Sequence, residues 1–253
     1  MAEFILSVHE LKKSFGSLHA LDGISFDLSS GQVSILIGPN GSGKTTLINV
    51  ITGLYKPDSG IVNFLGRNIT GLPPHKLYNM GISRTFQIPS LFTHLTVLEN
   101  LLVAQKGNPG ESFLKSLVKR SWVEYERRTI EKASRILDLL GLRGLWNVPS
   151  SYLSGGQMKL VEIGRALMSD AKLLLLDEPV SGVNPTLAHE IFSRILKLRD
   201  ELGLSFLIVE HRLDIALRYV DEIFAMALGR LIASGLPDEV LNDKRVIEAY
   251  LGT

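Results

Sequence analysis

The clearest chemical signal in the chain is an octapeptide at residues 38–45, GPNGSGKT, which fits the pattern G-x-x-x-x-G-K-[ST] at every fixed position. Glycines in this pattern let the backbone wrap a phosphate while its N–H groups point inward at the anion. The Lys44 ammonium would balance the charge of the β- and γ-phosphates, and the Thr45 hydroxyl can bind Mg²⁺. The segment therefore predicts a phosphate-binding loop. Its candidate nucleotide ligands are Gly38, Pro39, Asn40, Gly41, Ser42, Gly43, Lys44, Thr45 and Thr46.

The flanking residues supply the context that a phosphate-binding loop needs. Residues 33–37 form a run rich in β-branched side chains, as expected of a buried strand, and residues 45–51 can open a helix. The order of strand, glycine loop and helix N-terminus argues against the alternative of a glycine-rich turn with a chance lysine.

Two adjacent acids, Asp177 and Glu178, follow four consecutive leucines at residues 173–176. In a phosphate-loop enzyme, a carboxylate at the end of a buried strand holds Mg²⁺, often through water, so Asp177 is a candidate metal ligand. A second carboxylate beside the metal can orient or deprotonate the attacking water, so Glu178 is a candidate catalytic base. The alternative is a pair of surface acids at a strand end, which the apolar run and the phosphate loop upstream disfavour.

A second candidate anion site is the segment LSGGQ at residues 153–157. Ser154 can cap a helix there, and Gly155 and Gly156 leave the first backbone N–H groups of that helix exposed. Taken alone, the segment could be a simple loop. Its place just upstream of an apolar strand that ends in two acids favours a second anion-binding helix start.

The elements that must position these groups alternate between strands and helices. Residues 173–176 and 205–209 are short and wholly apolar or nearly so, which suits strands covered on both faces, as in a parallel sheet. The pattern indicates an α/β core. Short strands are predicted over residues 4–8, 24–28, 33–37, 60–65, 173–176 and 205–209, and helices over residues 45–51, 157–167 and 188–202.

Residues 95–142 have a different character, because apolar residues recur there at helical spacing. A polar piece at residues 105–128 interrupts that spacing, and we interpret it as an insertion in a helical part of the chain. Its several basic charges are typical of a solvated face rather than of a binding site.

Bulk composition narrows the classes of protein. The 253 residues are 45% hydrophobic and 21% charged, as in an ordinary globular protein, and the net charge of +1 gives no strong electrostatic case for a nucleic-acid partner. The absence of cysteine excludes disulfides and thiolate metal sites. The N-terminus does not resemble a signal peptide, and no apolar run approaches the ~20 residues of a spanning helix. A role at a membrane would therefore need another subunit to cross it.

The order of five motifs resembles that of ATP-binding cassette (ABC) transporter ATPases over essentially the whole chain. The motifs are the phosphate loop, Gln87, the highly specific signature LSGGQ, residues 173–178 and His211. The resemblance implies an α/β fold with a P-loop NTPase core, a mixed, largely parallel sheet, an N-terminal antiparallel β portion and a helical subdomain inserted before the signature. The implied domain spans residues 1–253, with a nucleotide-binding core at 1–87 and 154–253 and a helical subdomain at 88–153 that carries the insertion at about 105–128.

The same resemblance implies a composite site. Cassettes of this family pair head to tail, so each ATP lies between the phosphate loop of one subunit and the signature of the other. The residues implied at a partner's nucleotide are Ser154, Gly155, Gly156 and Gln157, the first three of them at its γ-phosphate.

The resemblance also implies roles for residues outside the two anion sites. Gln87 would sense Mg²⁺ and the attacking water, as a metal ligand and a catalytic residue, and His211 would contact the γ-phosphate as a catalytic switch. Phe15 would stack on adenine, although a lone phenylalanine in a strand is usually a core residue. Asn184 stands where many cassettes have aspartate, and it keeps a hydrogen-bonding oxygen but loses the charge.

Several details resemble a narrower group, the ATPases of branched-chain (hydrophobic) amino-acid importers. They are residues 84–87, residues 95–102 with the insertion after them, Glu210 with His211, and the ending at residues 246–252. Importers of that group typically use two different cassettes, two permeases and an extracytoplasmic binding protein, and this chain resembles the longer cassette. The resemblance implies an ATPase at the cytoplasmic face of the membrane, held there by transmembrane permeases and paired with an identical or a different cassette.

Other functions stay open at this stage. Importers of urea or amides belong to the same relatives, and the cassette of lipopolysaccharide export is close but lacks an insertion of this kind. A soluble ABC protein that acts on DNA or ribosomes usually carries two cassettes in one chain or a long coiled-coil insertion. This sequence has one cassette and no sustained heptads, which disfavours that class. A regulatory module that binds nucleotide without hydrolysis is disfavoured by the presence of Glu178 and His211.

Overall fold

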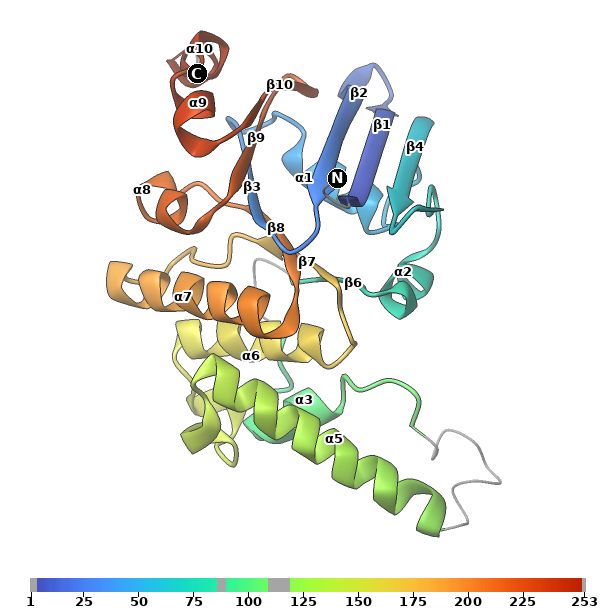
Figure 1. Ribbon diagram of the computed structural model, residues 1–253, viewed down its shortest axis with the longest axis vertical. Helices are drawn as coiled ribbons and strands as arrows, with labels where there is room; N and C mark the ends of the chain where they lie inside the picture. The colour runs from blue at the N-terminus through green and yellow to red at the C-terminus, as the bar shows by residue number, and fades with distance from the viewer. Residues whose placement is uncertain (1–3, 86–89, 109–118, 252–253) are drawn as a thin grey trace.

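The computed structural model describes residues 4–85, 90–108 and 119–251. These residues form two β-sheets at one end of an elongated molecule and layers of helices toward the other end (Figure 1). The predicted α/β class, with a mixed, largely parallel sheet and an N-terminal antiparallel portion, is confirmed by the pairing of the strands.

The N-terminal portion is an antiparallel sheet with the strand order β2-β1-β4-β5. Its strands are β1 (Phe4–Phe15), β2 (Leu18–Ser29), β4 (Ser59–Phe64) and β5 (Arg67–Asn68). β1 and β2 extend well beyond the predicted residues 4–8 and 24–28. The additional residues pair as far as Lys12 opposite Asp22 and beyond, and they include the buried Leu11 and Leu21. Register shifts between Val8 and Leu11 and between Leu11 and Lys12 interrupt the alternation of buried and exposed positions, so the sequence pattern does not reveal them.

The mixed sheet has the strand order β10-β9-β3-β8-β7-β6. Its neighbours pair in parallel except for β9 and β10, which form an antiparallel hairpin at one edge. The strands are β3 (Val33–Ile37), β6 (Ile82–Arg84), β7 (Leu173–Asp177), β8 (Ser205–Val209), β9 (Glu222–Ala227) and β10 (Arg230–Gly235).

The helices are packed mainly against the mixed sheet and against one another. They are α1 (Lys44–Ile51), α2 (Pro74–Met80), α3 (Val97–Leu102), α5 (Lys119–Leu140), α6 (Gly155–Leu167), α7 (Pro185–Leu202), α8 (Leu213–Ala216), α9 (Pro237–Leu241) and α10 (Lys244–Leu251), with 3₁₀ turns at Arg143–Leu145, Ser150–Tyr152 and Leu217–Tyr219. The helices predicted at 45–51, 157–167 and 188–202 are confirmed and begin slightly earlier, because their caps precede the first apolar position. Within the described ranges, no helix combines the length and the hydropathy of a membrane span.

Helix α5 takes in the second part of the polar piece that was interpreted as an insertion, because it begins at Lys119. Residues 109–118 lie outside the described residues. Charges on the exposed surface of α5 pair along the helix, and hydrogen bonds from Arg127 and Arg128 lower the pKa of Glu124 to about 2. These ion pairs support the first part of the helix, whose buried apolar residues begin only at Ala133, so helical spacing of apolar residues does not mark its start.

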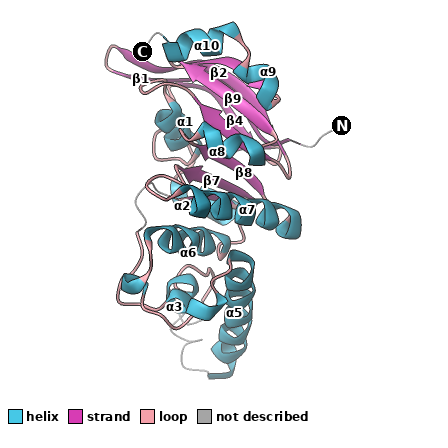
Figure 2. Cartoon of the chain, turned by 90° about the vertical axis from the view of Figure 1, so that its left-hand side faces the viewer, coloured by secondary structure: helices cyan, strands magenta, loops and turns pink. Residues whose placement is uncertain are grey.

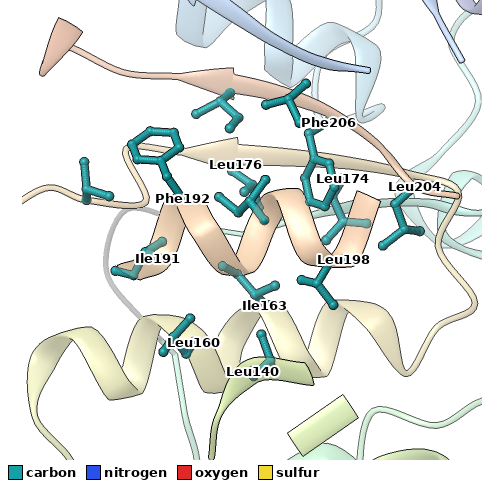
Figure 3. Packing of buried hydrophobic residues seen from close by; sticks show 14 of the residues in the cluster. Leu140, Leu160, Ile163, Leu174, Leu176, Ile191, Phe192, Leu198, Leu204 and Phe206 are labelled. Carbon is teal, nitrogen blue, oxygen red and sulfur yellow. The ribbon is translucent and has the colours of Figure 1, made fainter. Parts of the chain in front are cut away.

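The leucine run of β7 is buried on both faces of the mixed sheet. Leu174 and Leu176 pack toward α6 and α7, in a cluster that includes Phe192 (Figure 3). Leu173 and Leu175 belong to a second cluster, which is shared with α1 and the antiparallel sheet. Helix α7 lies between the mixed sheet and α6, and α5 packs on the side of α6 toward the helical end (Figures 1 and 2). β7 is therefore covered by α7 on one face and by the cluster with α1 and the antiparallel sheet on the other, which requires a wholly apolar strand.

Candidate functional site

Three neighbouring strands of the mixed sheet end at one edge, and the candidate chemical groups follow those ends. β8 pairs in parallel with β3 and β7, and its Val209 lies opposite both Leu36 and Asp177. The phosphate loop leaves β3, Asp177 ends β7, and His211 follows β8 after one residue. Ligand sites in α/β sheets lie outside the carboxyl ends of the strands, so the topology itself gathers these residues.

Two glycines of the phosphate loop are required by close contacts. Gly38 has a φ of 148°, and a Cβ there would lie 2.1 Å from the carbonyl oxygen of Met226. Gly43 has a φ of 102°, and a Cβ there would lie 2.5 Å from the carbonyl oxygen of Ala20. Any larger residue would collide with backbone atoms and would strain the backbone, so the loop keeps this shape only with glycine at both positions.

The loop borders a cavity of about 470 Å³ that also contains the candidate acids. Its walls include Thr45, Thr46, Asp177, Glu178 and His211. A cavity of this size lies within the usual range for cofactor and small-molecule sites. The structure thus brings together groups from three separate strand ends around one space large enough for a ligand.

Lys44 is nearly buried, at 6% exposed, inside the phosphate loop. Its Nζ donates hydrogen bonds to the carbonyl oxygens of Gly38 at 2.7 Å and of Pro39 at 3.0 Å. Burial lowers the pKa of Lys44, and the negative charges of Glu178 and Asp177 oppose that shift. The ammonium therefore lies at the floor of the loop, where a bound phosphate could compete for its donors.

Asp177 is tied to neighbouring elements through Arg84 of β6. Arg84 Nη2 donates to Asp177 Oδ2 at 2.8 Å, and Nη1 donates to Asn49 Oδ1 on α1. The ion pair is mostly buried, with side-chain exposures of 9% for Arg84 and 16% for Asp177, so the carboxylate is held in one orientation. In the sequence analysis, Arg84 was only one residue of a segment that carried the family resemblance. Its contact with Asp177 arises because β6 and β7 are neighbouring strands.

Glu178 and His211 lie side by side at the wall of the cavity, with His211 Nε2 3.3 Å from Glu178 Oε1. Glu178 has a φ of 48°, and its N–H donates to the carbonyl oxygen of Val209 at 2.8 Å. Glu210 is 2% exposed and accepts the N–H groups of Val180 and His211, which fixes both loops. A carboxylate and an imidazole in this arrangement can orient or transfer a proton. Nothing in the local sequence distinguished Glu210 as the residue that holds the two loops together.

The signature segment begins helix α6. Ser154 Oγ accepts the N–H of Gln157, and Gln157 Oε1 accepts the N–H of Ser154 at 2.9 Å, in a reciprocal capping box. Gly156 packs so closely on α7 that a Cβ there would lie 2.1 Å from Leu187 Cδ2. Ser154 and Gly155 are exposed, and neither lines the cavity at this chain's phosphate loop. The structure therefore places the signature apart from the loop of the same chain.

The remaining candidates fall in different places. Phe15 is 44% exposed at the end of β1, where its ring meets Tyr55 edge-on at a centroid distance of 5.3 Å, so it is not a core residue. Gln87 lies outside the described residues. Asn184 caps α7, and its Oδ1 accepts the N–H of Leu187 at 2.9 Å. Asparagine and aspartate are equally good caps, so the missing charge does not weaken this helix start.

The C-terminal helix α10 contacts the phosphate loop from outside the cavity. The Tyr250 hydroxyl accepts the N–H of Gly38 at 2.8 Å, across 212 positions of the sequence. Burial raises the pKa of the Tyr250 hydroxyl, and the hydrogen bond from Gly38 opposes that shift. In the sequence analysis, residues 246–252 contributed only to the family resemblance. No local sequence pattern indicates that Tyr250 contacts the phosphate loop.

Two family models match parts of the chain. Residues 21–181 match a family described as ABC transporter, and residues 230–253 match one described as branched-chain amino acid ATP-binding cassette transporter. The fold is that of ABC transporter ATP-binding cassettes, and the chain belongs to the ABC transporter family.

Individual relatives agree with the narrower resemblance. The chain is 49% identical to a probable branched-chain amino acid transport ATP-binding protein LivG of Archaeoglobus fulgidus, over 98% of this chain and 95% of that protein. It is 50% identical to a protein of the same description from Methanocaldococcus jannaschii, over 98% of this chain and 97% of that protein. A crystal structure of the ADP conformation of an ABC transporter cassette is 48% identical, with a TM-score of 0.85 and 99% of each chain covered. The predicted resemblance to the importer cassettes is confirmed.

Proposed function

We propose that the chain binds ATP and Mg²⁺ and hydrolyses ATP to power the uptake of branched-chain amino acids through partner permeases. The observation that carries the proposal is the meeting of the phosphate loop, Asp177, Glu178 and His211 around one cavity. The choice of transported substrate rests on relatives named as branched-chain amino acid transport ATP-binding proteins. Those names favour a branched-chain amino acid importer over a urea or amide importer and over a lipopolysaccharide exporter.

Mg²⁺ would be held by Thr45 and Asp177, with Gln87 as a third candidate. Thr45 and Asp177 present hydroxyl and carboxylate oxygens to the same cavity, and such oxygens, with waters and phosphate oxygens, are the ligands that Mg²⁺ prefers. When bound, Mg²⁺ neutralises the charge of the β- and γ-phosphates. Arg84 keeps the Asp177 carboxylate oriented.

The catalytic step is assigned to the two groups that lie side by side. Glu178 orients or deprotonates the water that attacks the γ-phosphorus, and His211, 3.3 Å away, holds the geometry of the transition state. The Lys44 ammonium and the N–H groups of the phosphate loop stabilise the phosphate charge. Phe15, exposed at the end of β1, stacks on the adenine ring.

The site is one half of a composite site completed by a second cassette. Ser154, Gly155 and Gly156 contact the γ-phosphate that the second cassette binds, and Gln157 supports them through the capping box. The exposure of the signature, away from the loop of its own chain, supports this arrangement. Hydrolysis removes the shared phosphate contacts, and the dimer opens.

The proposed organisation is a nucleotide-binding core at residues 1–87 and 154–253 and a helical subdomain at 88–153. Helix α6 packs both on α7 of the core and on α3 and α5, so it joins the two parts. The cassette works at the cytoplasmic face of a membrane, bound to two permeases that receive substrate from an extracytoplasmic binding protein. The membership of the ABC transporter family supports this location.

Deleting this chain from its source cells should abolish their branched-chain amino-acid uptake. We expect a deletion strain to lose saturable uptake of radiolabelled leucine and to regain it with the wild-type chain but not with Lys44→Ala. Uptake of radiolabelled urea in the same strains is the matched control and should not change. Intact leucine uptake together with lost urea uptake would instead favour a urea importer.

Tyr250→Phe should weaken ATP binding by about five-fold, because a net hydrogen bond contributes about 1 kcal/mol and this one orders the first residue of the loop. Calorimetric titration with ATP measures the change. Tyr219→Phe is the matched control, since it removes a hydroxyl that bonds His189 Nδ1 at 2.9 Å on α7. Equal ATP affinities in Tyr250→Phe and Tyr219→Phe would show that α10 does not order the loop.

A further inference from the structure

Lys159 lies on α6, on the turn that follows the signature, and reaches the loop that carries Glu178. Its Nζ donates to the carbonyl oxygen of Glu178 at 2.9 Å and to that of Ser181 at 2.7 Å. The N–H of Ser181 also donates to the Glu178 carbonyl, at 3.1 Å. The ammonium therefore closes a turn over residues 178–181 from the side of the signature helix.

The backbone of Glu178 needs such support because its conformation is unusual. A φ of 48° is left-handed, and a non-glycine residue is strained there unless its surroundings hold it. The Glu178 N–H is held by the carbonyl oxygen of Val209 at 2.8 Å, and its carbonyl oxygen is held by Lys159. Both sides of the residue are thus fixed, and the side chain is left 3.3 Å from His211.

The charge of Lys159 is held against the cost of its burial by three acids nearby. Burial lowers the pKa of Lys159, and the negative charges of Glu210, Glu178 and Glu162 oppose that shift. Glu210 in turn accepts the N–H of Val180 at 2.9 Å, so the same turn is held by an anion from β8 and a cation from α6. Two buried or half-buried charges of opposite sign hold one short segment of backbone, which is a costly arrangement for stability alone.

We propose that Lys159 is a positioning residue for Glu178, and that it fixes the carboxylate relative to the start of the signature helix. The inference rests on the proposed function, in which Glu178 acts on the attacking water. Lys159 does not line the cavity and is assigned no contact with nucleotide. Its effect is therefore expected in the rate of hydrolysis and not in the binding of ATP.

The test compares Lys159→Met, Lys159→Arg and Lys132→Met in steady-state ATP turnover, ATP titration and thermal unfolding. Lys159→Met should lower kcat by about 10-fold, with KM and the ATP dissociation constant within about two-fold of wild type. Lys159→Arg keeps the positive donor and should recover most of kcat. Lys132→Met is the matched control, because Lys132 Nζ on α5 also donates to a backbone carbonyl, that of Met168 at 2.7 Å, away from the cavity.

Wild-type kcat in Lys159→Met would overturn the proposal. So would a fall in kcat that Lys159→Arg does not relieve, or one that comes with weaker ATP binding. If Lys159→Met does not fold, the same criteria apply to Lys159→Gln, which is shorter and uncharged. A failure of the proposed function gives a different result from a failure of this inference. In that case the Glu178→Gln chain would turn over ATP as fast as wild type, whatever the effect of the Lys159 substitutions.

Discussion

Glu178→Gln is expected to lower ATP turnover by about 10²- to 10⁴-fold, because it keeps the size of the side chain and removes the carboxylate that accepts a proton. ATP affinity should stay within about two-fold of wild type, since the phosphate loop is untouched. Phosphate release by the purified chain measures turnover, and calorimetric titration measures affinity.

A matched control for this substitution is Glu190→Gln on α7. Glu190 pairs with Arg194 on the helix surface, so the same chemical change occurs away from the cavity and should leave turnover unchanged. Equal turnover in Glu178→Gln and wild type would remove Glu178 as the catalytic base. A chain that binds ATP with no turnover in either form would fit a regulatory nucleotide-binding module.

Lys44→Ala is expected to abolish measurable ATP binding, with a loss of about 100-fold or more in affinity. Hydrogen bonds to charged groups contribute about 1.5–3 kcal/mol each, and the ammonium is assigned to both the β- and γ-phosphates. Calorimetric titration of the variant with ATP and Mg²⁺ measures the loss.

The Lys44 experiment needs a check on the loop itself, because the ammonium also binds the carbonyl oxygens of Gly38 and Pro39. Thermal unfolding without nucleotide should show a folded variant, and Lys132→Met should bind ATP as wild type does. Retained ATP affinity in folded Lys44→Ala would count against the role of the phosphate loop.

The parts of the fold that could be predicted from sequence are those in which burial dictates residue type. β3 and β8 match their predicted ranges and β7 extends one residue beyond its run of leucines, because these central strands are covered on both faces and must be apolar throughout. The extension of β1 and β2 follows strand pairing with shifted register, and the start of α5 is supported by ion pairs on the surface. Neither leaves a regular apolar period in the sequence.

The candidate site divides in the same way. The phosphate loop, Asp177 and Glu178 were predicted from strands and motifs, and the family resemblance added His211. The structure brings them together because the strands they follow are neighbours in the sheet, which their order along the chain does not reveal. Arg84 and Lys159 could not be predicted, because each acts through a partner that only the packing of separate elements supplies. Arg84 and Asp177, for example, are 93 positions apart in the sequence.

The central claim is that this cavity is one half of a composite ATP site, and the mass of the ATP-loaded Glu178→Gln chain tests it most directly. Gel filtration with light scattering should give twice the 27.9 kDa of the chain at saturating ATP and Mg²⁺, because uncleaved ATP keeps both halves joined. Adding Ser154→Arg to the same chain should return the mass to that of one chain, since it blocks the signature. A mass of 27.9 kDa for Glu178→Gln alone, with ATP demonstrably bound, would contradict a composite site formed by two copies of this chain.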